Sequence, residues 1–405
     1  MGLGFKGIRA PGGLSAKVCQ EVASIIQRDG SGSQLESFDQ IMAPRPMLDP
    51  SPAFVRKLLV PTTRHVSLAI QAMWSASDGF EWIDVLARRP EVRDFSLTYG
   101  SGMHGMYGRG LRDGIPQGES MVEHLALCRV PNRLAHAFDF PRLKSFKYIS
   151  ADEGRDSEVP LIPLLNGIPL RNLEELSLVG CDSFDHSPLD AVAFDSLISL
   201  TLRKSSRLAS VLLDSLAGSL PFPSLKHLDL SRMRLDPTHL RLFSSDSAPH
   251  LTSLDLSFTT FTTKFEPSHF PIFAALETLN LSRTAWPTNQ LVEELRTTTP
   301  VIKSLNLSGC GSGERALTGS AIVNLVRARR LIPSPPTPPS PSSWICTTNS
   351  LYSPTPSADA SSIPSTKFET AMQELDLQNL MGIETVAVDW LKANMRKGTV
   401  KFKFL

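Results

Sequence analysis

The sequence lacks the features by which several classes of protein are recognised. Its five cysteines form no CxxC pair and are odd in number, which argues against a zinc cluster or a disulfide framework and favours a reducing compartment. No apolar run approaches the ~18 residues that span a bilayer, and the first residues lack the apolar core of a secretory signal. The 41 Lys and Arg residues balance 40 Asp and Glu residues, so no positive bias favours nucleic acid or anionic lipid. We therefore expect a cytoplasmic or nuclear protein that binds neither nucleic acid nor a membrane.

Motifs that carry catalytic or metal chemistry are equally scarce. The nine histidines form no HExxH motif and no compact Cys/His set, so no metal site is predicted. Asp185-His186-Ser187 contains the residue types of a hydrolytic triad, but adjacent residues rarely converge on one reacting atom, so a polar turn is the better interpretation. We expect no catalytic residue, no metal and no cofactor.

One glycine motif matches part of the dinucleotide-binding pattern. Gly100-Ser101-Gly102-Met103-His104-Gly105 is a GxGxxG sequence directly after an expected strand at 92–99. A dinucleotide site also needs a helix immediately afterwards, whose N-terminus holds the pyrophosphate, but residues 106–120 contain four more glycines and a proline, which oppose a helix. The motif is therefore interpreted as a loop between repeats, with a nucleotide-dependent enzyme using Gly100–Gly105 as the less favoured alternative.

The sequence does contain an internal repeat of aliphatic triplets. The pattern L-x-x-L-x-L occurs unchanged five times and in near copies five more times. The unchanged copies are Leu173-Leu176-Leu178, Leu197-Leu200-Leu202, Leu225-Leu228-Leu230, Leu251-Leu254-Leu256 and Leu276-Leu279-Leu281. The near copies begin at Val92, Val122, Leu143, Ile302 and Met372.

The period predicts one strand and one helix per unit. Successive units between 173 and 302 begin 24–28 residues apart, whereas the last two, at 302 and 372, are 70 apart. The long interval contains the Pro- and Ser-rich segment 331–366, which is too poor in apolar residues to offset its ordering entropy and is predicted to be a disordered insert. Removing it restores the period.

The triplet spacing predicts how each unit packs. Alternate residues of a strand point to opposite faces, so the second and third aliphatic residues face inward together and the residues between them face outward. Apolar residues at helical spacing predict return helices at 207–218, 288–296, 318–330 and 383–396, with Asp236-Pro237 beginning another. The expected fold class is therefore an α/β solenoid with a curved parallel sheet on its concave side and helices on its convex side.

These residues resemble the leucine-rich-repeat family, whose wider pattern is L-x-x-L-x-L-x-x-N/C-x-L. Cys181 and Cys310 occupy the N/C position, and Ser205, Thr259 and Thr284 occupy it in other units. This mixture is similar to the cysteine-containing, ribonuclease-inhibitor-like intracellular branch. Many members of that branch are substrate-recognition subunits of ubiquitin ligases with an F-box ahead of the repeats, but residues 1–90 contain no recognisable F-box.

The domain organisation follows from the repeat. Residues 1–60 are predicted to form an N-terminal helix and a linker and to be partly disordered, and 61–330 to form the solenoid, with Thr63-Val66-Leu68 as an irregular first unit. Residues 331–366 are the insert, and 367–405 the final repeat and cap, in which 399–405 alternates apolar and charged residues like a closing strand.

The concave face is the expected binding site. Outward positions there carry polar residues of mixed charge, which suit a polar protein partner as well as plain solvation. The candidate partner-binding residues are Asp229, Asp255, Asn280, Asn306 and Asp376, with Lys226, His227, Glu277, Lys303 and Glu374 beside them.

The resulting functional hypothesis is a protein-interaction scaffold rather than an enzyme. The family resemblance implies, as a finer possibility, a substrate-recognition subunit of a ubiquitin ligase. Regulation of a small GTPase by charged loops is the alternative from a different class.

Overall fold

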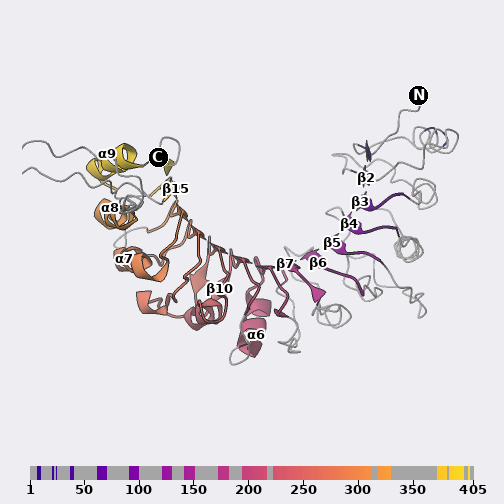
Figure 1. Cartoon of the computed structure of the whole chain (residues 1–405), viewed down its shortest axis with the longest axis horizontal. Helices are drawn as coiled ribbons and strands as arrows, with labels where there is room; N and C mark the ends of the chain where they lie inside the picture. The colour runs from indigo at the N-terminus through magenta and orange to yellow at the C-terminus, as the bar shows by residue number, and fades with distance from the viewer. Residues whose placement is uncertain are drawn as a thin grey trace, which may run out of the picture.

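The molecule is built on one long parallel sheet. The computed structural model describes residues 7–10, 21, 24, 37–40, 62–70, 91–99, 121–129, 141–150, 172–181, 194–216, 222–311, 317–329, 372–380, 383–395 and 400–401. Within them, 14 strands pair in chain order (Figure 1). They are β1 Gly7–Ala10, β2 Ser37–Gln40, β3 His65–Ile70, β4 Asp94–Tyr99, β5 His124–Cys128, β6 Ser145–Ile149, β7 Glu175–Val179, β8 Ser199–Thr201, β9 His227–Asp229, β11 Ser253–Asp255, β13 Thr278–Asn280, β14 Ser304–Asn306, β15 Glu374–Asp376 and β16 Val400–Lys401. A separate pair joins β10 Arg234–Leu235 to β12 Thr260–Phe261.

The repeated aliphatic residues form the core under this sheet. In β9, β11 and β13 the middle residues Leu228, Leu254 and Leu279 lie in register, and each is at most 2% exposed. The flanking residues of these strands are less buried, as the period of two requires. One such leucine covers little area alone, but the stacked ladder shields every member from water, so stability is collective.

Helices return the chain on the other side of the sheet. The labelled helices lie along the outer side of the arc, and the strands of the 14-stranded sheet along its inner side (Figure 1). The described helices are α6 Ser206–Leu216, the 3₁₀ segments η4 Pro237–Phe243 and η5 Pro267–His269, α7 Asn289–Thr298, α8 Gly319–Ala328 and α9 Thr385–Asn394. The architecture is thus the predicted α/β leucine-rich-repeat solenoid. Among these helices, none combines the length and apolarity that a bilayer crossing requires.

Local sequence explains where the helices begin. The Thr288 hydroxyl accepts a hydrogen bond from Leu291 N at 3.2 Å, and α7 then buries Leu291, Val292 and Leu295, the stripe that the sequence predicts. Asp236 caps η4 by accepting from Thr238 N at 2.9 Å, with Pro237 in the first turn. That segment is a 3₁₀ helix.

The N/C positions hold buried polar side chains that satisfy backbone carbonyls at the turn after each strand. Ser205, Thr259 and Thr284 are each at most 2% exposed. Thr259 Oγ1 donates to Leu256 O at 2.6 Å, Thr284 Oγ1 to Leu281 O at 2.5 Å, and Cys310 Sγ to Leu281 O at 2.8 Å. A buried carbonyl without a donor would be costly, which explains why small polar residues recur at these positions.

The last repeat stacks directly on the unit that precedes the long interval. β14 pairs with β15 through Leu305 and Leu375, although 70 residues separate these partners. A Cβ added at Gly319 of α8 would collide with the Cβ of Ala387 in α9, so the two helices are also in close contact. Residues 331–366 lie outside the described residues.

The sheet begins earlier than the proposed solenoid boundary at residue 61. β3 buries Val66 and Leu68 at the predicted first unit, but β1 and β2 continue the same sheet ahead of it. The segments GIRA and SFDQ contain no aliphatic triplet, so the repeat pattern gave no sign of them. These strands pair through backbone N–H and C=O groups, which are present in every sequence, so pairing does not require a particular side-chain pattern.

Candidate functional site

The exposed face of the sheet carries three parallel columns of side chains. The central column contains the residue between the two buried residues of each strand; from β3 to β15 it is Ser67, Ser96, Ala126, Lys147, Ser177, Thr201, Asp229, Asp255, Asn280, Asn306 and Asp376. The flanking column, two residues earlier, includes His65, Asp94, His124, Ser145, Glu175, His227, Thr278, Ser304 and Glu374. The leading column contains the residue just before each flanking residue. It includes Arg93, Glu123, Lys144, Lys226, Glu277 and Lys303. The sheet register therefore brings all ten sequence-predicted residues together between β9 and β15.

The Asp and Asn side chains of the central column also accept hydrogen bonds from backbone amides. Asp229 Oδ1 accepts a hydrogen bond from Ser231 N, and Asp255 Oδ1 from Ser257 N, both at 2.8 Å. Asn280, Asn306 and Asp376 accept the same bond at 3.1, 2.9 and 3.1 Å. These side chains form Asx turns where the strands end.

Sequence reasoning did not identify this structural role. The signal was present as the recurring tripeptides DLS, DLS, NLS, NLS and DLQ, in which Asp or Asn precedes the accepted amide by two residues. One oxygen of each side chain is thus committed to the fold, and at Asp255 the second oxygen accepts from Asn280 Nδ2 at 3.0 Å.

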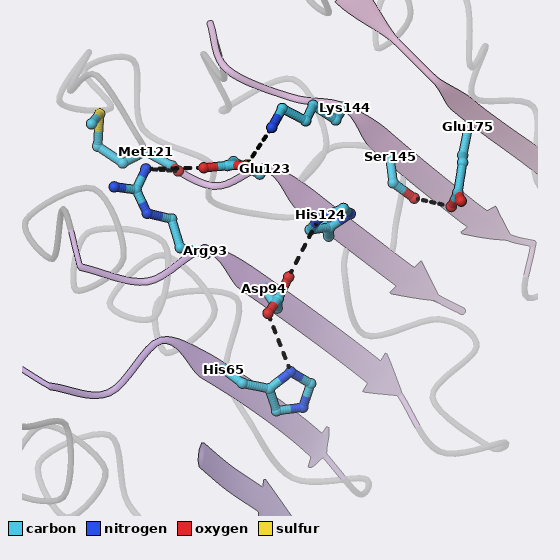
Figure 2. Close-up of polar contacts among 9 residues, drawn as sticks. All are labelled: His65, Arg93, Asp94, Met121, Glu123, His124, Lys144, Ser145 and Glu175. Atoms are coloured by element: carbon cyan, nitrogen blue, oxygen red, sulfur yellow. Dashed lines mark hydrogen bonds and ion pairs between the residues drawn. The ribbon is translucent and has the colours of Figure 1, made fainter. Parts of the chain in front are cut away.

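Ion pairs cross the strands in the N-terminal part of the face. Glu123 lies between Arg93, at 3.3 Å, and Lys144, at 2.8 Å (Figure 2). The hydrogen bond from Lys144 lowers the pKa of Glu123 and raises that of Lys144. Asp94 lies between His65 and His124 of the neighbouring strands, 3.8 Å from a ring nitrogen of each (Figure 2). Charges on this half of the face are therefore largely matched by their neighbours.

The C-terminal part combines paired and unpaired polar groups. Lys303 contacts Glu277 at 2.5 Å, and Lys401 contacts Glu374 at 2.6 Å. Lys226 and His227 are exposed, and their side chains make no hydrogen bond or ion pair with another residue in the described part of the chain. Such groups can take a partner's hydrogen bonds without breaking internal ones.

The side chains of this face can donate and accept hydrogen bonds and form ion pairs. In the described residues no group of three His, Cys, Asp or Glu side chains could hold a metal ion. Cys128 and Cys310 are free thiols, and burial raises the pKa of Cys310, which keeps it protonated. The GxGxxG motif at 100–105 and Asp185-His186-Ser187 lie outside the described residues.

Comparisons with known proteins yield structural likeness alone. No protein-family model matches the chain, and no curated protein matches its sequence. A chain in a crystal structure of a Rad7 and Elc1 complex from yeast is 14% identical, over 76% of this chain and 87% of that one, with a TM-score of 0.37. A Bacteroides fragilis protein of solved structure is also 14% identical, over 76% and 67% of the two chains, with a TM-score of 0.32. At such TM-scores neither likeness bears on what this chain binds.

Proposed function

We propose that this chain is a protein-interaction scaffold, without a catalytic role, that binds a partner on its concave face. The observation that carries the proposal is the unbroken strand register from β3 to β15, which converts scattered polar residues into one continuous surface. A surface of this kind makes many dispersed polar contacts and so suits a protein better than a small molecule.

The segment from β9 to β15 is the proposed centre of the binding surface. Lys226 and His227 offer exposed donors on one strand, and Thr278 offers an exposed hydroxyl two strands away. Asp229 and Asp376 contribute negative charge from the carboxylate oxygen that does not accept the Asx-turn bond. All ten predicted residues therefore remain binding candidates, although five of them also support the backbone.

The test compares partners captured by the full chain and by two charge variants. The concave variant Lys226→Glu/Thr278→Lys changes exposed side chains that make no internal hydrogen bond in the described residues. The control variant Arg241→Glu/Glu293→Lys reverses the charge of two exposed residues, one on η4 and one on α7. We expect quantitative mass spectrometry to show at least one partner depleted about tenfold by the concave variant and retained by the control.

Two outcomes would contradict the proposal. Recovery of every partner by the concave variant would show that the face is merely solvated. Depletion of the partners by the control variant alone would place binding on the convex side.

The finer assignment within this role is the cysteine-containing, ribonuclease-inhibitor-like branch, in the cytoplasm or nucleus. The buried Cys181 and Cys310 at the N/C positions support the branch, and a reducing compartment preserves a buried thiol such as that of Cys310. A substrate-recognition role in a ubiquitin ligase is a further step of the same proposal. A captured partner whose ubiquitylation and half-life are unchanged when this chain is removed would refute that step.

A further inference from the structure

A row of exposed side chains follows the carboxyl ends of β8, β9, β11 and β13. Lys204, Arg232, Phe258 and Arg283 each stand two residues after the last buried leucine of their unit. Lys204 N donates to Ser231 O, Arg232 N to Ser257 O and Phe258 N to Ser282 O, so each residue neighbours the next. We call these four residues the strand-end row.

The backbone at the strand-end row favours glycine, yet all four residues carry large side chains. Their φ angles are 55°, 58°, 57° and 56°, in the left-handed region where a Cβ is strained. Gly180 and Gly309 occupy the equivalent positions after β7 and β14, with φ of 71° and 65°. Strain retained at four consecutive units favours a use for these side chains beyond the fold.

The centre of the row is an aromatic ring between two guanidinium groups. Phe258 is 38% exposed, and the Cζ atoms of Arg232 and Arg283 lie 4.7 and 5.3 Å from its ring centroid. Among the described residues, no carboxylate forms an ion pair with either arginine or with Lys204. Stacking thus orients the two guanidinium groups and leaves their N–H donors to solvent.

We propose that the strand-end row binds an acidic polypeptide segment in an extended polyproline-II conformation. Carboxylates would pair with Arg232 and Arg283, and the residues between them would pack on Phe258. The two arginines are two strand spacings apart, about 10 Å. In polyproline II, residues three apart project from the same side about 9 Å apart, so acidic residues at that spacing match both arginines.

Charge around the row favours a polypeptide over nucleic acid. Asp229 and Asp255 lie three residues before Arg232 and Phe258, and would repel a continuous phosphate backbone. The chain as a whole carries a formal charge of only +1. A short segment with two carboxylates meets the cations without crossing that acidic column.

The proposal deepens the scaffold function by naming a partner chemistry, and its test is independent of the concave-face variants. A random peptide library displayed on phage would be selected against the full chain. We expect enrichment of peptides with Asp or Glu three residues apart. One selected peptide, and a counterpart with its acidic residues changed to Gln or Asn, would then be measured by fluorescence anisotropy.

Two row variants and one control separate binding from folding. We expect Arg232→Ala/Arg283→Ala to weaken the peptide about tenfold or more, and the control Arg234→Ala/Arg241→Ala to leave affinity unchanged. Phe258→Gly should also weaken binding while preserving or raising the melting temperature, because glycine relieves the positive φ.

Selected peptides without an excess of acidic residues, or peptides that bind both row variants like wild type, would overturn the proposal. Tighter, row-dependent binding of an oligothymidylate would replace the peptide by nucleic acid as the ligand. If the row binds its peptide but no partner depends on the concave variant, the scaffold proposal fails for that face and the row proposal stands.

Discussion

The backbone amide of Ser231 donates a 2.8 Å hydrogen bond to Oδ1 of Asp229, and four further units repeat this contact. The same carboxylate lies on the face proposed to bind a partner, so Asp229 has both a structural role and a proposed binding role. Substitutions at Asp229 can distinguish the two roles.

Asp229→Ala and Asp229→Asn are expected to differ in stability. Alanine removes the acceptor of the Ser231 amide and should lower the free energy of unfolding by about 1 kcal/mol. Asparagine keeps an oxygen acceptor, so its effect should stay within about 0.5 kcal/mol. Urea denaturation of both variants measures the difference; equal loss in both would mean that charge, rather than the Asx turn, matters at this position.

Arg329 is expected to stabilise the end of α7. Its guanidinium donates at 2.6 Å to three carbonyls, those of Pro300, Leu295 and Thr299, and only 7% of the residue is exposed. Arg329→Ala removes all three of these bonds; Leu295 O still accepts from Thr299 N and Oγ1, and Thr299 O from Ile302 N, so the loss should be about 1–3 kcal/mol. The decrease is measured by urea denaturation, with hydrogen exchange showing loss of protection in the last turn of α7. Arg241→Ala, at an exposed position of η4, is the control.

Gly319 is expected to resist substitution because α9 packs against it. An alanine Cβ there would collide with the Cβ of Ala387, so Gly319→Ala should destabilise the chain by about 1–3 kcal/mol. Ala387→Gly should recover part of this loss in the double variant, because it removes the colliding atom. Additive losses in a double-mutant cycle would refute the direct contact.

The contact between Glu374 and Lys401 is expected to make stability depend on acid pH. The hydrogen bond from Lys401 lowers the pKa of Glu374 below its ordinary 4.5, so the stabilisation is present above about pH 4.5 and is lost as pH falls through the folded-state value. The same bond raises the pKa of Lys401 above its ordinary 10.5. The contribution of Lys401 to stability is therefore complete below about pH 10.5 and is lost only as the pH rises through its folded-state pKa. Glu374→Gln should therefore lose less stability than wild type between pH 5 and 3. Urea midpoints across that range test it, with Glu293→Gln as a control that should follow wild type.

Deleting residues 331–366 is expected to leave the solenoid intact. α8 ends at Ala328 and β15 begins at Glu374, so the deletion leaves nine connecting residues, 329–330 plus 367–373. The connection from α7 to β14 uses five, 299–303. A shorter connection between adjacent units that already contact each other through β14–β15 and α8–α9 costs little, so the urea midpoint should be unchanged or slightly higher. Loss of cooperative unfolding would show that the segment contributes to the fold.

Much of the architecture could be predicted because its cause is local and repeated. Leu228, Leu254 and Leu279 are buried because alternation within each strand turns them to one face, and the repeat of about 26 residues stacks these faces on one another. Helix starts at Thr288 and Thr318 followed from capping chemistry that involves only the next three residues. Strands β1 and β2 could not be predicted, because backbone pairing leaves no mark on side-chain pattern.

The candidate site was predictable in position but not in role. The alternation of the strands placed Asp229 and Asp255 on the open face, and the structure adds that each accepts a backbone amide. The stacking of Phe258 between Arg232 and Arg283 has no counterpart in the sequence, since these residues lie in three different units.

By itself, then, the sequence determined which residues are hidden and which are presented, because burial follows a periodicity that can be counted along one chain. Only the tertiary structure decided which presented residues touch, because neighbours across a parallel sheet are about 26 residues apart and their contacts depend on register and side-chain direction. That difference separates the fold, fixed by many equivalent leucines, from the binding chemistry, which depends on a few unlike side chains meeting at one edge.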